Sequence, residues 1–205
     1  MIGGAAISVK QINDETMHML ELAYENVNQA FGQLLQFSDK IDEQIYKRED
    51  TVNYLDKVIS EYISTALATP NLNVNISQAL SSYYLMLVDI ERISDYAVNM
   101  NHQATKRLQG DMTISEIEIV EHMKKLCVDM KNDLSDVEEA ERKDDVIDSL
   151  VSSWREAQIQ ALKQQKCSSE VSMMLSRIFT DFERINDHAL NVSQEFDKIN
   201  IEIPE

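Results

Sequence analysis

Apolar residues recur every three or four positions along almost the whole chain, which is the period of an α-helix. The stripe is clearest near the end of the sequence, where it begins at Val171 and continues through Leu175 and Ile178 to Ile199. Such stripes favour antiparallel helices packed around a shared core. The pattern predicts six helices, at residues 11–37, 41–68, 75–108, 113–139, 142–166 and 169–199.

Local signals mark three of the breaks between these helices. Pro70 ends the second helix, because proline lacks a backbone N–H and restricts the residue before it. Gly110 is suited to a left-handed cap after the third helix, and Thr113 with Glu116 forms a capping box that begins the fourth. Ser168 is the predicted N-cap of the last helix. The other two breaks rest on charged residues alone, at 37–41 and 139–142.

Two stretches of the sequence are copies of each other. Residues 89–100 read DIERISDYAVNM and residues 181–192 read DFERINDHALNV, so seven of twelve positions are identical at an offset of 92 residues. A weaker echo lies upstream of each copy, where EDTVNYL begins at residue 49 and DDVIDSL begins at residue 144. Internal repetition indicates a duplicated structural unit. We therefore predict an all-α fold of two tandem three-helix bundles packed as one domain, residues 1–109 and 110–205.

The composition narrows the possible functions. Only four glycines and two prolines occur in 205 residues, which argues against an all-β fold and removes glycine-rich phosphate loops. The 36 acidic and 19 basic residues give a net charge of −17, a sign that repels nucleic acids and anionic membrane surfaces. Cys127 and Cys167 have neither a CxxC nor a zinc spacing, and they indicate a reducing compartment.

Residues 62–88 carry no charge, but they do not suit a membrane span. The run is 27 residues long and contains Pro70, Asn71 and Gln78 among other groups that hydrocarbon does not accommodate. We therefore expect no direct membrane insertion of this segment.

The repeated segments carry acids in pairs four residues apart. Residues at this spacing lie about 40° apart around a helix and share a face. That face lies away from the apolar stripe, and the upstream helices carry a similar arrangement with one amide in place of an acid. The pairs are Glu91 with Asp95, Glu183 with Asp187, Asp144 with Asp148, and Glu49 with Asn53.

Two interpretations of these pairs stay open. Like charges at this spacing repel, and oxygen ligands without thiolates suit a hard or borderline ion such as Mg²⁺, Mn²⁺, Ca²⁺ or Fe. A plain solvated face is the alternative, because acid pairs are frequent in an acidic chain. Arg92 and Arg184 also admit a simple role, in which each pairs with a neighbouring acid. His188 points away from Asp187, and we interpret it as a structural hydrogen-bonding group.

Two copies of a D/E-R-I-x-D-x-A-x-N motif, each closing a three-helix unit, resemble the PhoU family across nearly the whole chain. That family has two repeats of a three-helix bundle, with an ExxxD motif on the third helix of each. Its members hold iron, zinc or other divalent ions with these acids and with acids on the middle helices. The resemblance implies a metal site built from Glu91, Asp95, Glu183, Asp187, Asp144, Asp148 and Glu49. Asn53 departs from the acidic pattern, and an amide is a weaker ligand.

The resemblance implies a regulatory, metal-binding module of phosphate homeostasis and no enzyme activity. Its expected cofactors are Fe, Zn, Mn or Mg ions. Its expected partners are the membrane domain of a phosphate transporter or a sensor kinase. The run from Tyr84 to Asp95 is most similar to the PhoU-like cytoplasmic tails of bacterial sodium/phosphate cotransporters, in which a membrane domain precedes the module and tethers it. A cytoplasmic location and a homodimer are also expected.

Three alternatives are carried forward. The first is a stand-alone PhoU-type regulator of a phosphate ABC transporter and its sensor kinase. The second is a helical interaction bundle without metal. The third is a carboxylate-bridged metal oxygenase or hydrolase, a class that needs histidine beside carboxylate, and no histidine falls on the acidic stripes.

Overall fold

The computed structural model describes residues 2–104, 110–132 and 135–199, and in these ranges the chain is helical apart from short connections. This confirms the all-α prediction. The long helices are α1 (Ile2–Leu35), α2 (Asp39–Leu67), α3 (Val74–Gln103), α5 (Ile114–Asn132), α6 (Val137–Lys163) and α7 (Ser169–Asp197).

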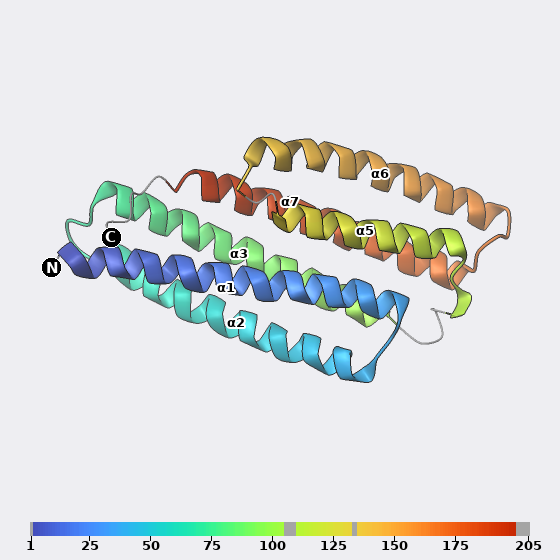
Figure 1. The fold of residues 1–205 in the computed structure, drawn as a ribbon, viewed down its shortest axis with the longest axis horizontal. Coiled ribbons are helices and arrows are strands. Elements are labelled where there is room, and N and C mark those ends of the chain that lie inside the picture. Colours follow the sequence, from blue (N-terminus) through green and yellow to red (C-terminus); the bar gives the residue numbers. More distant parts are fainter. Residues whose placement is uncertain (1, 105–109, 133–134, 200–205) are drawn as a thin grey trace.

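The helices run roughly along one long axis, and α3 and α7 lie side by side in the middle of the molecule (Figure 1). Helix α3 makes its most extensive contacts with α1 and α7. Helices α2 and α6 lie at the two outer edges, each against the last helix of its own repeat. Helix α5 departs from strict duplication, because it packs more extensively against α1 than against α6 or α7. The two repeats therefore share one core.

Aromatic side chains tie the repeats together inside that core. Phe31 on α1 and Phe182 on α7 are both fully buried and meet edge to face, with ring centroids 6.2 Å apart. Trp154 on α6 lies at the edge of the core and stacks on Phe179 with centroids 6.2 Å apart. Such pairs add to the free energy gained from burying apolar area alone.

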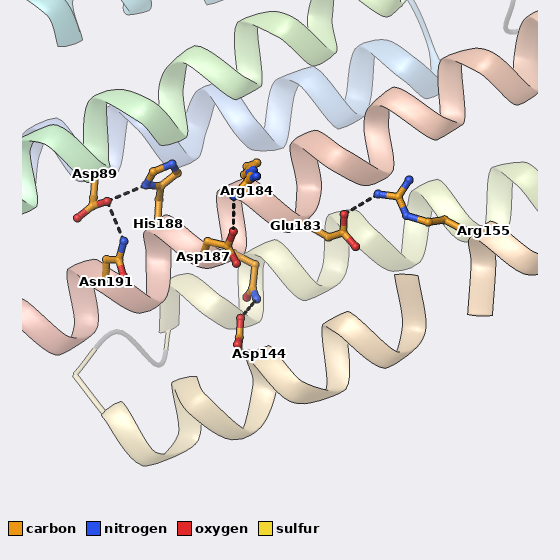
Figure 2. Close-up of polar contacts among 9 residues, drawn as sticks. Asp89, Asp144, Arg155, Glu183, Arg184, Asp187, His188 and Asn191 are labelled. Carbon is orange, nitrogen blue, oxygen red and sulfur yellow. Dashed lines mark hydrogen bonds and ion pairs between the residues drawn. The ribbon is translucent and has the colours of Figure 1, made fainter. Parts of the chain in front are cut away.

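Polar contacts join α3 to α7 as well (Figure 2). The Asp89 carboxylate on α3 lies 2.7 Å from Nδ1 of His188, and the same oxygen accepts a hydrogen bond from the Asn191 amide at 3.1 Å. The His188 ring also stacks on Tyr96, with centroids 5.8 Å apart. His188 is therefore a structural hydrogen-bonding group that joins the repeats, as predicted.

The predicted capping residues at two helix starts are confirmed. The Thr113 hydroxyl accepts from the backbone N–H of Glu116 at 3.3 Å, and the Glu116 carboxylate accepts from the N–H of Thr113 at 2.7 Å. The Ser168 side chain accepts from the N–H of Val171 at 3.1 Å. These bonds satisfy backbone donors that a helix N-terminus leaves unpaired.

Two expectations about the breaks are wrong. The break expected at 139–142 lies earlier, because the Asp136 side chain caps α6 by accepting from the N–H of Glu139 at 3.0 Å. Gly110 is not a left-handed cap, since none of the described glycines has a positive φ. Residues 105–108, predicted to end the third helix, lie outside the described residues, as does the last residue of the first predicted domain.

The uncharged residues 62–88 form the end of α2, the turn that contains Pro70, and the first half of α3. Asn71 provides the turn with a φ of 59°, a conformation that asparagine tolerates better than most residues. Of the helices in the described ranges, none is both long enough and apolar enough to cross a bilayer.

The shared core predicts a large loss of stability when an aromatic contact between the repeats is removed. We expect Phe182→Ala to lower the free energy of unfolding by about 3–5 kcal/mol, because a cavity replaces a fully buried ring. Val146→Ala is the control, since Val146 is 53% exposed and the change should stay within about 0.5 kcal/mol. Urea unfolding followed by circular dichroism measures both; equal effects would contradict a core shared at Phe182.

Candidate metal centre

A buried carboxylate lies between α2 and α3 in the first repeat. Glu49 is only 8% exposed, and its Oε2 accepts a hydrogen bond from the Ser94 hydroxyl. Its other oxygen, Oε1, is buried and has no hydrogen-bond partner among the described residues. The sequence pattern placed Glu49 on a face away from the core. That expectation is wrong, because the packing of α3 on α2 covers this side of the helix.

Two further acids, Asp95 and Glu91, lie near Glu49. Burial raises the pKa of Glu49; interactions with the Ser94 hydroxyl and the Asn53 amide oppose this shift, and the charges of Asp95 and Glu91 add to it. Burial and the nearby charge of Asp95 also raise the pKa of Glu91, with a smaller contribution from Asp56, whereas Arg92 and His188 oppose the shift. We call Glu49, Asp56, Glu91 and Asp95 the first-repeat cluster. The negative charges of Asp95 and Glu91 disfavour the ionisation of Glu49.

The second repeat makes the same contact at the equivalent positions. The Asn186 side-chain amide donates a hydrogen bond to Asp144, as the Ser94 hydroxyl does to Glu49. Burial raises the pKa of Asp144, and the charges of Asp148 and Asp187 add to the shift. Together with Glu183, these acids form what we call the second-repeat cluster.

Arg155 makes the two clusters electrostatically different. Its Nη2 lies 2.5 Å from Oε2 of Glu183 (Figure 2). It also donates to the Thr180 hydroxyl at 3.2 Å. The residue at the matching position of α2 is Ser60, which has no charge. The second-repeat cluster therefore contains its own counter-ion on α6, whereas α2 supplies none at that position.

The repeated arginines pair with their own helices. Arg92 Nη1 lies 3.4 Å from Asp95, and Arg184 Nη1 lies 3.3 Å from Asp187, three residues along the chain in each case. Both guanidinium groups are more than half exposed, so solvent screens these pairs. The prediction that these arginines pair with neighbouring acids is confirmed.

A metal ion needs several ligand side chains close together. In the described part of the chain, no three His, Cys, Asp or Glu side chains stand close enough to hold an ion as they are. The first-repeat cluster nevertheless supplies carboxylate oxygens, one of them buried and unpartnered. Hard cations prefer such ligands, and the second-repeat cluster offers fewer because Glu183 is already paired.

The acid pairs in the sequence did not predict every residue in or beside these clusters. Asp56 lies seven residues after Glu49, two helical turns along the same face, and that spacing was a usable signal. Arg155 gave no signal, because nothing in the repeat motif extends that far along α6. Ser94 and Asn186 were visible as aligned polar positions, but their bonds to the middle helices depend on how the helices pack.

Comparisons with known proteins agree with the duplicated architecture. The family model described as the PhoU domain matches residues 16–104 and again 114–196. The phosphate-specific transport system accessory protein PhoU homolog 1 of Thermotoga maritima is 24% identical over 196 residues, which are 90% of this chain and 83% of that protein.

Two crystal structures share the fold. PhoU from Pseudomonas aeruginosa superposes with a TM-score of 0.80 at 18% identity, covering 92% of this chain and 95% of its own. The phosphate transport system regulatory protein PhoU from Streptococcus pneumoniae gives a TM-score of 0.79 at 16% identity, covering 98% of this chain and 99% of its own.

The raised pKa of Glu49 predicts a pH-dependent cost of folding. An acid whose pKa is higher in the folded state destabilises the protein above that pKa, and the cost disappears as the pH falls towards the unfolded pKa of about 4.3. Glu49→Gln keeps an oxygen that accepts from Ser94 and removes the ionisation. In the presence of a chelator, we expect this variant to be more stable than wild type at neutral pH and equally stable near pH ~4.

Urea unfolding at several pH values tests this expectation. Glu61→Gln on the exposed side of α2 is the control, and it should leave the pH dependence unchanged. A Glu49→Gln variant that is less stable than wild type at neutral pH would show that the ionised carboxylate is well accommodated without a cation.

Proposed function

The chain belongs to the PhoU domain family, and on that premise we propose that it is a cytoplasmic regulator of phosphate transport whose first-repeat cluster binds a metal ion. The two matched domain copies support the regulatory role. The Thermotoga relative is by name an accessory protein of a phosphate-specific transport system, and the Streptococcus protein is by name a regulatory protein of phosphate transport. The proposal assigns no reaction to the chain.

The stand-alone regulator is better supported than the cotransporter tail that the sequence analysis preferred. The relatives with printed roles are accessory or regulatory proteins of a transport system. We therefore propose that the partner is a phosphate ABC transporter or its sensor kinase, contacted by protein surface.

The metal proposal rests on one observation, the unpartnered buried oxygen of Glu49. A buried carboxylate oxygen without a partner is costly, and either a proton or a cation removes that cost. Asp95 and Glu91 add negative potential at the same place, which favours a divalent cation over a proton at neutral pH. Glu49, Glu91 and Asp95 are the residues that would hold it, and Asp56 lies beside Glu91.

The two repeats differ in expected affinity. The sequence predicts a weaker metal site in the first repeat, because Asn53 replaces an acid there. The contacts favour the first repeat instead, since Arg155 neutralises Glu183 in the second. An incoming ion there would compete with a guanidinium that is already in place. We propose one stronger site in the first repeat and a weaker one formed by Asp144, Asp148 and Asp187.

A bound ion would act on the shape of the bundle. Glu49 belongs to α2, whereas Glu91 and Asp95 belong to α3, so an ion shared by these carboxylates ties the outer helix to the central one. The ion replaces mutual repulsion between the helices with attraction, and it stabilises the state that binds it. Regulation would follow if the transporter or kinase recognises the surface that α2 and α3 form together.

Paired variants in the two repeats test the metal site. Adding Mn²⁺ to chelator-treated wild-type protein should raise its stability, by about 2.7 kcal/mol at a hundredfold excess over Kd. We expect Glu91→Ala/Asp95→Ala to abolish most of this gain, and Glu183→Ala/Asp187→Ala to retain it. Thermal unfolding with and without Mn²⁺ measures the gain for each protein against its own metal-free state. If both variants keep the wild-type gain, the acids form a solvated face.

Phosphate uptake tests the regulatory role separately. In cells that lack this chain, we expect the rate of phosphate uptake to stop responding to external phosphate, and the wild-type chain to restore the response. The Glu91→Ala/Asp95→Ala chain should restore it only in part, provided that its abundance matches wild type. An uptake response that is unchanged by the deletion would contradict the proposed function.

A further inference from the structure

An apolar groove lies between the end of α6 and the start of α7, the half of this hairpin distal to both acidic clusters and next to its connecting turn. The groove has a volume of about 430 Å³, and Phe179 lies in it as a fully buried residue. Ile159 and Leu162 line the α6 side and are 52% and 40% exposed, and Met173 on α7 is 62% exposed. Apolar side chains gathered along a groove at this exposure are typical of interaction surfaces.

The internal repeat shows how this groove arises. Ser172 and Ser176 line it on α7, and the matching positions of α3 carry Leu80 and Tyr84. Leu80 is 1% exposed and fills the equivalent place in the first repeat. Two large side chains in one repeat are therefore replaced by small hydroxyl residues in the other.

The stretch that forms the groove is less acidic than the rest of the chain, whose net charge is −17. Residues 149–180 carry four basic and two acidic side chains, and Glu183, just beyond this stretch, pairs with Arg155. Lys163 and Lys166 are exposed at the same end of the hairpin as Leu162. Arg155 lies at the other end of the groove and packs over the Phe179 ring at 5.7 Å.

We propose that this groove, which we call the distal groove, binds an amphipathic helix of a partner protein, one that presents apolar side chains flanked by carboxylates. A groove between two helices suits the apolar face of a third helix. The exposed Lys163 and Lys166 at one end of the groove select acidic flanks and repel basic ones. A second copy of this chain would bring its own lysines against these, and the interaction is independent of any bound metal ion.

Two synthetic helical peptides test the proposal. They share one apolar stripe of leucines, and their flanking positions are all glutamate in one and all lysine in the other. A chelator is present throughout. At low salt, we expect the glutamate peptide to bind about tenfold more tightly than the lysine peptide, because a few exposed ion pairs together contribute the corresponding free energy. The preference should shrink as added salt screens these charges. Fluorescence anisotropy of labelled peptides measures both affinities.

Charge-matched variants locate the binding surface. Met173→Glu and Ile159→Glu each place a carboxylate in the distal groove, and each should weaken binding of the glutamate peptide at least about tenfold. Ser81→Glu and Ser64→Glu are the controls, because these exposed serines occupy the matching positions of the first repeat. Both control proteins should bind as wild type. All four sites are exposed, and circular dichroism checks that each variant is folded.

Several outcomes would overturn the proposal. These are a failure of both peptides to bind, equal binding of the two, or equal losses in the groove and control variants. Self-association of wild-type protein that Met173→Glu abolishes would assign the groove to a second copy. Binding to phosphatidylserine vesicles that Met173→Glu abolishes would assign it to a membrane surface. If wild-type protein binds the glutamate peptide but does not bind Mn²⁺, the metal proposal is contradicted and the groove proposal stands.

Discussion

The burial of one carboxylate between two helices is the constraint on which this account depends. Glu49 accepts from Ser94 with one oxygen, while its other oxygen is buried without a partner among the described residues. Asp144 and Asn186 make the equivalent bond in the second repeat, so both units pack an outer helix on a central helix through a carboxylate. It sets the register of each outer helix against its central helix and places the other acids beside it.

Duplication followed by divergence gives the two halves different chemistry. Arg155 satisfies Glu183 in the second repeat, where the first repeat has Ser60 at the matching position and keeps its acids crowded. The second repeat also has Ser172 where the first has Leu80, and Ser172 lines the distal groove. We propose that one half binds an ion and the other a partner protein, on a single core in which Phe31 contacts Phe182.

Periodicity and repeats were enough to predict the helices, the duplication and two of the N-caps, Thr113 and Ser168, because these depend on local sequence. Thr113 with Glu116 is an example in which both partners lie within one turn. The start of α6 was missed because Asp136 stands among many acids, any of which could cap a helix. The burial of Glu49 and the pairing of Arg155 depend on which helices pack together, and the spacing of residues in one helix does not contain that information.

Diffraction from crystals soaked in Mn²⁺ tests the central claim most directly. The anomalous signal of manganese locates the ion without reference to activity or stability. The account predicts a peak between α2 and α3, within coordination distance of Glu49 and of Glu91 or Asp95, and a weaker peak or none beside Asp144. A peak only in the second repeat, or only at the protein surface far from Glu49, would contradict it.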